Sequence, residues 1–222
     1  MMKKRSDSYV KIEIWSDYVC PFCYIGKRRL EEALASTGLG NQVEVVYKAY
    51  ELDPNSPATS EETMQESLAG KYNMSVAEAK GMTDNVVVQA ETVGLKYDFA
   101  SLRPANTFNA HRIAKLAEQE GLGEEITERL LQAYFTESKE IGLNEVLIEI
   151  CEEVGISKER AEAVLNSEEF ADDVKADITE AGQIGAQGVP FFVINRKYAI
   201  SGAQPAETFA EALQKVAEEE GI

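Results

Sequence analysis

The feature that most constrains the fold is a strand pattern that leads directly into a Cys-x-x-Cys pair and a helix. Residues 9–15 alternate apolar and polar side chains with period two, which predicts a β-strand. After a turn, Cys20-Pro21-Phe22-Cys23 opens a pattern with helical spacing that ends at Gly38. Residues 43–52 predict a second strand. This strand–helix–strand order predicts two neighbouring parallel strands.

The middle of the chain shows helical spacing without a convincing strand. Gly and Pro residues separate seven such segments, which are residues 61–72, 75–93, 106–119, 124–138, 143–154, 158–166 and 168–184. Ser75 and Glu78 fit a capping box at the start of the second segment. The sequence therefore predicts a long block of helices between two strand-forming ends.

The last part of the chain returns to strands. Residues 191–194 and 197–200 predict a hairpin, and residues 206–220 predict a terminal helix. We therefore predict an α/β core made of residues 1–57 and 185–222, with residues 58–184 as an inserted all-α domain.

Charge and hydropathy exclude several classes of partner. The formal net charge is −17, so a phosphate backbone would be repelled and nucleic acid is not expected as a partner. No apolar stretch of signal-peptide length follows the basic residues near the N-terminus, and no segment has the length and hydropathy of a membrane span. We therefore expect a cytoplasmic protein without a membrane partner, where thiols are kept reduced. The oligomeric state cannot be predicted.

The Cys20–Cys23 pair predicts redox chemistry. A cysteine at the start of a helix faces unpaired N–H groups and the positive end of the helix dipole, which favour the reactive thiolate. Pro21 suits the first helical position, because it has no N–H to lose there. Cys23, one turn along, is near the Cys20 sulfur and more shielded. This spacing predicts that Cys20 is an exposed attacking thiolate and that Cys23 resolves the mixed disulfide.

Zinc binding is the main structural alternative for the pair. A tetrahedral zinc site needs two more ligands, and only Cys151 and His111 remain among cysteines and histidines. They lie on separate predicted helices without paired spacing. We therefore predict no metal.

Three separated motifs resemble the DsbA-like proteins, in particular their cytoplasmic FrnE branch. Residues 14–26, IWSDYVCPFCYIG, look like the family's active-site segment. Residues 106–112, NTFNAHR, resemble a motif in that branch's helical insert. Residues 185–194, GAQGVPFFVI, are similar to the family's cis-proline loop. With residues 200–204, ISGAQ, the resemblance spans nearly the whole chain.

The resemblance implies a thioredoxin-like fold that an α-helical domain interrupts, with substrate bound between the two. It implies a dithiol–disulfide oxidoreductase of the oxidase or isomerase type. It also implies that Pro190 forms a cis peptide beside Cys20 and directs the Val189 backbone at an extended substrate. We accordingly expect two sets of site residues. Those expected to be catalytic are Cys20, Cys23 and Pro190, and those expected to bind substrate are Pro21, Phe22, Val189, Asn106 and His111.

A related branch, the 2-hydroxychromene-2-carboxylate isomerases, provides the alternative function. These proteins share the fold but resemble glutathione transferases in chemistry, and they carry a serine where this chain has Cys20. The alternative is a glutathione-dependent isomerase or transferase for an aromatic or polyketide substrate, and a non-catalytic binding module is a third. We favour dithiol chemistry on thiol- or disulfide-bearing proteins or small molecules. Apart from the dithiol no cofactor is expected, although glutathione as a co-substrate stays open.

Several other residues have two interpretations. His111, the only histidine, suits acid–base chemistry, but helix packing is its more common role. Cys151 lies on an apolar helical face and is expected to act as a small hydrophobic residue. Trp15 suits either the rim of the site or the core. Glu13 and Asp17 are both possible proton acceptors for Cys23, and spacing selects neither.

Overall fold

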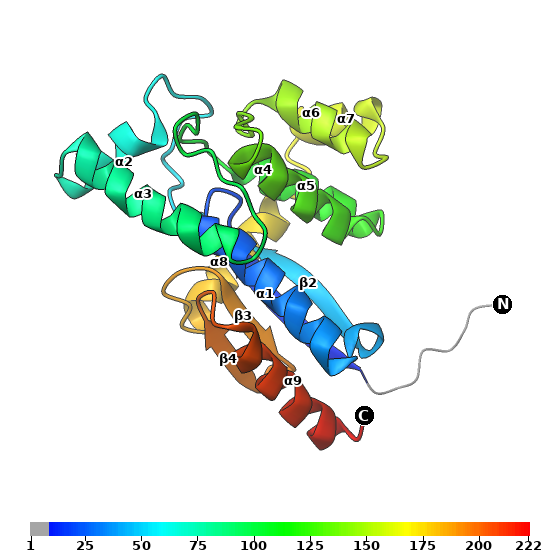
Figure 1. Cartoon of the computed structure of the whole chain (residues 1–222). Coiled ribbons are helices and arrows are strands. Elements are labelled where there is room, and N and C mark those ends of the chain that lie inside the picture. The colour runs from blue at the N-terminus through cyan, green and yellow to red at the C-terminus, as the bar shows by residue number, and fades with distance from the viewer. Residues whose placement is uncertain (1–8) are drawn as a thin grey trace.

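A computed structural model describes residues 9–222, and its centre is a mixed four-stranded sheet with the order β2-β1-β3-β4 (Figure 1). Its strands are β1 (Val10–Ser16), β2 (Val43–Ala49), β3 (Phe191–Ile194) and β4 (Tyr198–Ser201). β1 and β2 are parallel, as predicted, with Val10 opposite Val43 and Ser16 opposite Ala49. β3 pairs antiparallel with β1 and with β4. Two separated parts of the chain therefore build one sheet.

Helices cover both faces of this sheet. On one face lie α1 (Pro21–Thr37) and α9 (Ala206–Glu220), which pack against Ile12 and Ile14 of β1. On the other face α8 (Ala171–Gln183) covers Trp15, whose indole N–H donates to the Asp177 carbonyl at 2.9 Å. Because side chains of a strand alternate between faces, the apolar run of β1 fills both cores. Trp15 therefore lies in the core and not at the rim of the site.

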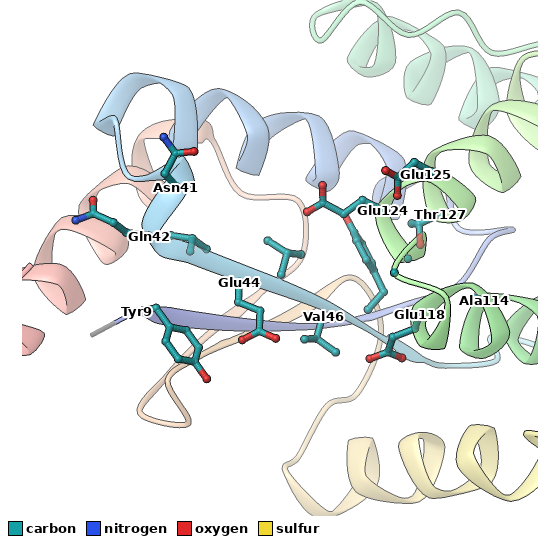
Figure 2. Close-up of a pocket in the computed structure, with 15 residues that line it drawn as sticks. Tyr9, Asn41, Gln42, Glu44, Val46, Ala114, Glu118, Glu124, Glu125 and Thr127 are labelled. Atoms are coloured by element: carbon teal, nitrogen blue, oxygen red, sulfur yellow. The ribbon is translucent and has the colours of Figure 1, made fainter. Parts of the chain in front are cut away.

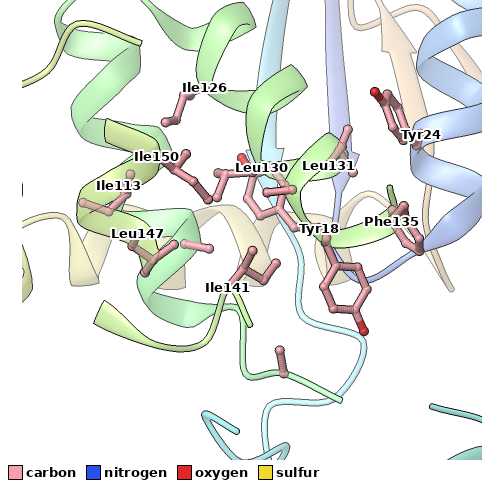
Figure 3. Packing of buried hydrophobic residues seen from close by; sticks show 14 of the residues in the cluster. Tyr18, Tyr24, Ile113, Ile126, Leu130, Leu131, Phe135, Ile141, Leu147 and Ile150 are labelled. Carbon is pink, nitrogen blue, oxygen red and sulfur yellow. The ribbon is translucent and has the colours of Figure 1, made fainter. Parts of the chain in front are cut away.

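The inserted helices form a second hydrophobic core, part of which Figure 3 shows. They are α2 (Met64–Tyr72), α3 (Val76–Glu91), α4 (Phe108–Gln119), α5 (Gly123–Phe135), α6 (Asn144–Glu153) and α7 (Lys158–Leu165). Tyr18 and Tyr24, on either side of the cysteine pair, reach into this core. The segment that carries the thiols is thus packed by both parts of the molecule, and the prediction of an α/β fold with a helical insert is confirmed.

Local sequence explains where most elements begin and end. The predicted capping box of Ser75 and Glu78 starts α3, and Thr63 with Glu66 forms another at α2. Gly38 ends α1 with φ +71°, a conformation that favours glycine. The second strand ends at Ala49, earlier than predicted, and the Leu52 N–H donates to the Asp17 carboxylate at 2.8 Å and not to a strand. The boundary at residues 184 and 185 stays a prediction, since α8 packs against both β2 and α4.

Charged groups join the insert to the sheet. The Glu128 carboxylate on α5 pairs with Lys27 at 2.6 Å and also with Arg28, both of which belong to α1. The Asp177 carboxylate accepts from the Ala49 N–H at 3.0 Å. It also pairs with Lys48 of β2 at 3.0 Å and with Lys115 of α4 at 2.7 Å. These buried or half-buried pairs fix the insert relative to the strands.

Candidate active site

The cysteine pair lies where β1 ends and α1 begins. Cys20 is the N-cap residue of α1, and Pro21 follows in the first turn, as its missing N–H predicts. The Cys20 N–H donates to the Asp17 carbonyl at 3.1 Å, and the Cys23 N–H donates to the Cys20 carbonyl at 3.0 Å. These two bonds close the turn. No side chain caps this helix start.

Both thiols of the pair are free and buried, which corrects the expectation that Cys20 is exposed. Cys20 is 4% exposed and Cys23 is 3% exposed. The reason is the loop before β3, because the Cys20 Sγ lies 3.5 Å from the Val189 carbonyl oxygen. Phe22, between the two cysteines, is 36% exposed and marks the open side of the site.

Cys23 is held as a protonated thiol. Burial, followed by the neighbouring Cys20 thiol, raises the pKa of Cys23 well above its usual value. The Asp17 N–H lies 3.5 Å from the Cys23 Sγ and can donate to it. This arrangement suits a thiol that reacts second, after a partner has already bonded to Cys20.

The structure gives neither Glu13 nor Asp17 a carboxylate contact with Cys23. Glu13 is buried on the same face of β1 as Trp15, where it pairs with Arg196. One Asp17 carboxylate oxygen accepts from the Leu52 N–H at 2.8 Å, and the other lies 3.4 Å from His111 Nε2. Neither carboxylate is therefore in contact with the Cys23 thiol.

The Val189–Pro190 peptide bond is cis, and its loop packs closely against α1. The Pro190 carbonyl accepts from the Gly202 N–H at 2.8 Å, which ties the loop to the end of β4. A Cβ atom on Gly26 of α1 would lie 3.1 Å from Pro190 Cγ and 3.2 Å from Phe192 Cζ. Glycine at position 26 thus permits the close approach that brings Val189 to Cys20.

The insert contributes a contact that the sequence did not reveal. Tyr97, in the segment between α3 and α4, donates its hydroxyl to the Pro21 carbonyl at 2.8 Å. Burial, and then the nearby Cys20, raises the pKa of Tyr97, so its hydroxyl stays protonated as a donor. Tyr97 follows no recognisable motif, and its ring is placed here by packing against Tyr24, Phe99 and Phe135.

Asn106 and His111 lie at the junction between the sheet and the insert. Thr107 is the N-cap of α4, without a side-chain cap bond, and Asn106 precedes it. Asn106 accepts from the Phe108 N–H at 3.0 Å and donates to the Pro54 carbonyl at 3.1 Å. His111 is 3% exposed and its Nε2 lies 2.9 Å from the Tyr50 carbonyl oxygen. Their roles in substrate binding stay predictions.

The remaining chemical candidates are structural or unsupported. Cys151 is fully buried in α6, and burial raises its pKa to about 12. Within residues 9–222, no group of three or more His, Cys, Asp or Glu side chains is placed to hold a metal ion. The same part of the chain contains no helix that is both long and apolar enough to cross a membrane. Residues 1–8, which carry the N-terminal basic residues, lie outside the described part.

Comparisons with known proteins place the chain in a family. The DSBA-like thioredoxin domain model matches residues 11–214. A probable DsbA oxidoreductase from Streptomyces coelicolor is 39% identical, with a TM-score of 0.90 over 95% of this chain and 91% of that chain. The uncharacterised protein YwbO of Bacillus subtilis is 28% identical over 92% of this chain and 96% of its own length.

A solved 2-hydroxychromene-2-carboxylate isomerase shares the fold with much lower sequence identity. It is 13% identical, with a TM-score of 0.70 over 95% of this chain and 98% of that chain. The predicted thioredoxin-like fold with a helical insert is thus confirmed, and the family match includes the thiols, the cis-proline loop and the insert between them. The chain belongs to the family of DSBA-like thioredoxin domains.

Proposed function

We propose that the protein is a dithiol–disulfide oxidoreductase that uses Cys20 and Cys23. The observation that carries this proposal is the geometry at Cys20. Its sulfur lies at the start of α1 and 3.5 Å from a backbone carbonyl of the loop before β3, with a second thiol one turn along the helix. A thiolate at Cys20 and an extended partner beside Val189 would meet at this point.

The reaction consists of two exchanges. The Cys20 thiolate attacks one sulfur of a substrate disulfide, a Cys20–substrate disulfide forms, and the other substrate sulfur leaves as a thiolate. Cys23 then loses its proton and attacks the Cys20 sulfur, which releases the second substrate thiolate. The two electrons pass from the dithiol to the substrate, and the protein is left with a Cys20–Cys23 disulfide. The same steps in reverse oxidise a substrate dithiol.

The substrate side is also a proposal. Phe22, half-exposed beside the thiols, provides an apolar surface, and the Val189 backbone provides hydrogen-bonding groups for an extended segment. Pro21 and Pro190 shape the two sides of this surface. A cytoplasmic thiol- or disulfide-bearing protein or small molecule fits this arrangement. Two molecules of glutathione would reduce the Cys20–Cys23 disulfide back to the dithiol and would be oxidised to glutathione disulfide.

The test is steady-state reduction of insulin and of a small aromatic disulfide by the purified protein. Cys20→Ser is expected to lose more than 100-fold in rate on both substrates, because the thiolate that attacks is gone. Cys151→Ser is the matched control and should keep the wild-type rate, since Cys151 is buried in α6. Full activity in Cys20→Ser would contradict the proposal. Glutathione-dependent isomerase activity that survives in Cys20→Ser/Cys23→Ser would favour the alternative chemistry instead.

A further inference from the structure

A groove lies along the outer edge of β2, apart from the dithiol site (Figure 2). Its volume is about 640 Å³. Its walls are the edge strand itself on one side and the C-terminal half of α4 with the start of α5 on the other. No residue that lines it belongs to the site described above. Consecutive residues of β2, whose side chains alternate between the two faces of the sheet, all line the groove. The groove therefore follows the edge of the strand and not one face of the sheet.

The edge of β2 offers backbone groups without partners. Tyr50 donates its N–H to Ser16 of β1 at 3.1 Å, whereas Ala49 donates its N–H away from β1 to Asp177 at 3.0 Å. The N–H and C=O groups of successive residues point to alternate sides of a strand. Those of Val43, Val45 and Tyr47 therefore point away from β1, as those of Ala49 do. Within residues 9–222, the backbone groups of these three residues make no hydrogen bond outside the strand pair. An exposed edge of this kind is a template for another strand.

The groove is strongly acidic. Glu44 of β2, Glu118 of α4, and Glu124 and Glu125 of α5 all line it (Figure 2). Glu118 pairs with Lys115 at 3.2 Å, but in the described part of the chain the other three have no Lys or Arg partner. Burial, followed by the carboxylates of Glu31 and Glu124, also raises the pKa of Tyr47 on the groove wall. The carboxylates therefore make the groove electronegative.

We propose that this groove binds an extended, lysine- or arginine-rich polypeptide segment, which adds to the sheet as a strand beside β2. The outward groups of Val43, Val45 and Tyr47 would pair with its backbone, and the groove carboxylates would pair with its basic side chains. The proposal is independent of the dithiol chemistry, because none of these groups takes part in thiol exchange.

Charge decides between a basic partner and a second copy of the chain. The chain has a net charge of −17, and a copy placed edge to edge would bring the same carboxylates against Glu44, Glu124 and Glu125. Like charges placed together oppose such pairing. A cationic segment removes this repulsion and also satisfies the free strand edge. The geometry thus favours a basic segment over self-association.

The test uses a cysteine-free probe, a fluorescent peptide of alternating Lys and Val with blocked ends, and measures its binding to the full chain by anisotropy. Binding is expected, and raising the salt concentration should weaken it. Glu124→Gln/Glu125→Gln should bind at least fivefold more weakly. The matched control Glu211→Gln/Glu218→Gln removes the same charge from exposed positions of α9 and should bind within twofold of the wild type. No binding, or equal loss in both double variants, would overturn the proposal.

A second arm tests strand addition. Val45→Pro removes an N–H that points away from β1, which an edge strand tolerates, and it should weaken binding at least tenfold. Val45→Ala keeps that N–H and should retain binding. If Val45→Pro does not fold, the same question is answered on the wild type by a probe methylated at every backbone amide, which should bind at least tenfold more weakly. Equal affinity for the two probes would reduce the contact to charge attraction and overturn the proposal.

Two further results would assign the groove to a different occupant. Concentration-dependent dimers in sedimentation of the wild type, lost in Val45→Pro, would show that a second copy covers the edge. Probe binding only after deletion of residues 1–8, which contain Lys3, Lys4 and Arg5, would show that the chain's own basic segment competes for the groove. Either result would overturn the choice of a separate basic partner. Wild-type thiol exchange in all groove variants is expected, and it keeps this test separate from that of the proposed function.

Discussion

The Cys20 sulfur lies 3.5 Å from the carbonyl oxygen of Val189, although 169 positions separate the two residues in the sequence. The sheet order explains this contact, because β3 pairs directly with β1 and the loop before it reaches the end from which α1 starts. Gly26 allows the loop to approach the helix. The sulfur is therefore enclosed by a backbone that an extended substrate would also contact.

Tyr97 is expected to control access to Cys20. Its hydroxyl holds the Pro21 carbonyl at 2.8 Å, so Tyr97→Phe should release the first turn of α1 and cost about 1 kcal/mol of stability. Alkylation of Cys20 by iodoacetamide, located by peptide mass, should become several-fold faster. Tyr134→Phe is the control, since that hydroxyl donates to the Arg103 carbonyl at 2.8 Å, away from the thiols. Equal alkylation rates in both variants would remove Tyr97 from the site.

The raised pKa of Cys23 predicts how the second exchange depends on pH. Burial is its main cause, ahead of the neighbouring Cys20. Below that pKa the thiolate fraction rises about tenfold per pH unit, so release of a preformed Cys20 mixed disulfide should accelerate in proportion from about pH 6 to pH 8. Stopped-flow measurement of the released thiol follows this step. A rate that levels off below about pH 8 would show that Cys23 ionises more easily than its burial implies.

His111 is expected to position the chain rather than to react. Its Nε2 contacts the Tyr50 carbonyl at 2.9 Å and its ring centre lies 4.8 Å from that of Tyr18. His111→Phe keeps the ring contact but removes the Nε2 contacts with the half-buried Tyr50 carbonyl and the buried Asp17 carboxylate, which should cost about 1–3 kcal/mol of unfolding free energy. Urea unfolding would show this loss, while kcat/KM for a small disulfide should stay within twofold. A large fall in kcat with unchanged stability would instead give His111 a chemical role.

We expect the Asp177 carboxylate to stabilise the fold at neutral pH and to lose this effect at low pH. Burial acts to raise the pKa of Asp177, but hydrogen bonds from Lys115, the Ala49 N–H and Lys48 outweigh it and lower that pKa. Because the pKa of Asp177 is lower in the folded than in the unfolded protein, its charge stabilises the fold at any pH above the unfolded-state pKa. This stabilisation is lost as the pH falls through the folded-state pKa. Asp177→Asn should therefore lose about 3 kcal/mol at pH 7, and less below about pH 4.

Urea titrations followed by Trp15, the single tryptophan, would check this difference at both pH values. Asp172→Asn on the same helix is the control, since the Asp172 side chain is fully exposed and its substitution should change little. A loss in Asp177→Asn that is the same in acid as at neutral pH would contradict the assigned charge.

The strand pattern of residues 9–15 and the Cys-x-x-Cys spacing were enough to predict β1, α1 and the parallel pairing with β2. These features depend on local periodicity and on the residue preferences of helix starts. The prediction that Cys20 is exposed is wrong, because its burial depends on Val189, which lies far along the chain. The Tyr97 contact and the free edge of β2 could not be predicted either, since both depend on how the insert packs and on strand order.

The central claim is that Cys20 attacks and Cys23 resolves, and trapping tests it most directly. Cys23→Ala, incubated with a disulfide-bonded protein substrate and examined by intact mass, should accumulate a one-to-one mixed disulfide that peptide mapping places on Cys20. Cys20→Ala and wild type should accumulate little, the first because it cannot attack and the second because Cys23 releases the substrate. A mixed disulfide on Cys151 or Cys23 in place of Cys20, or none in Cys23→Ala while the wild type still turns over substrate, would contradict the account.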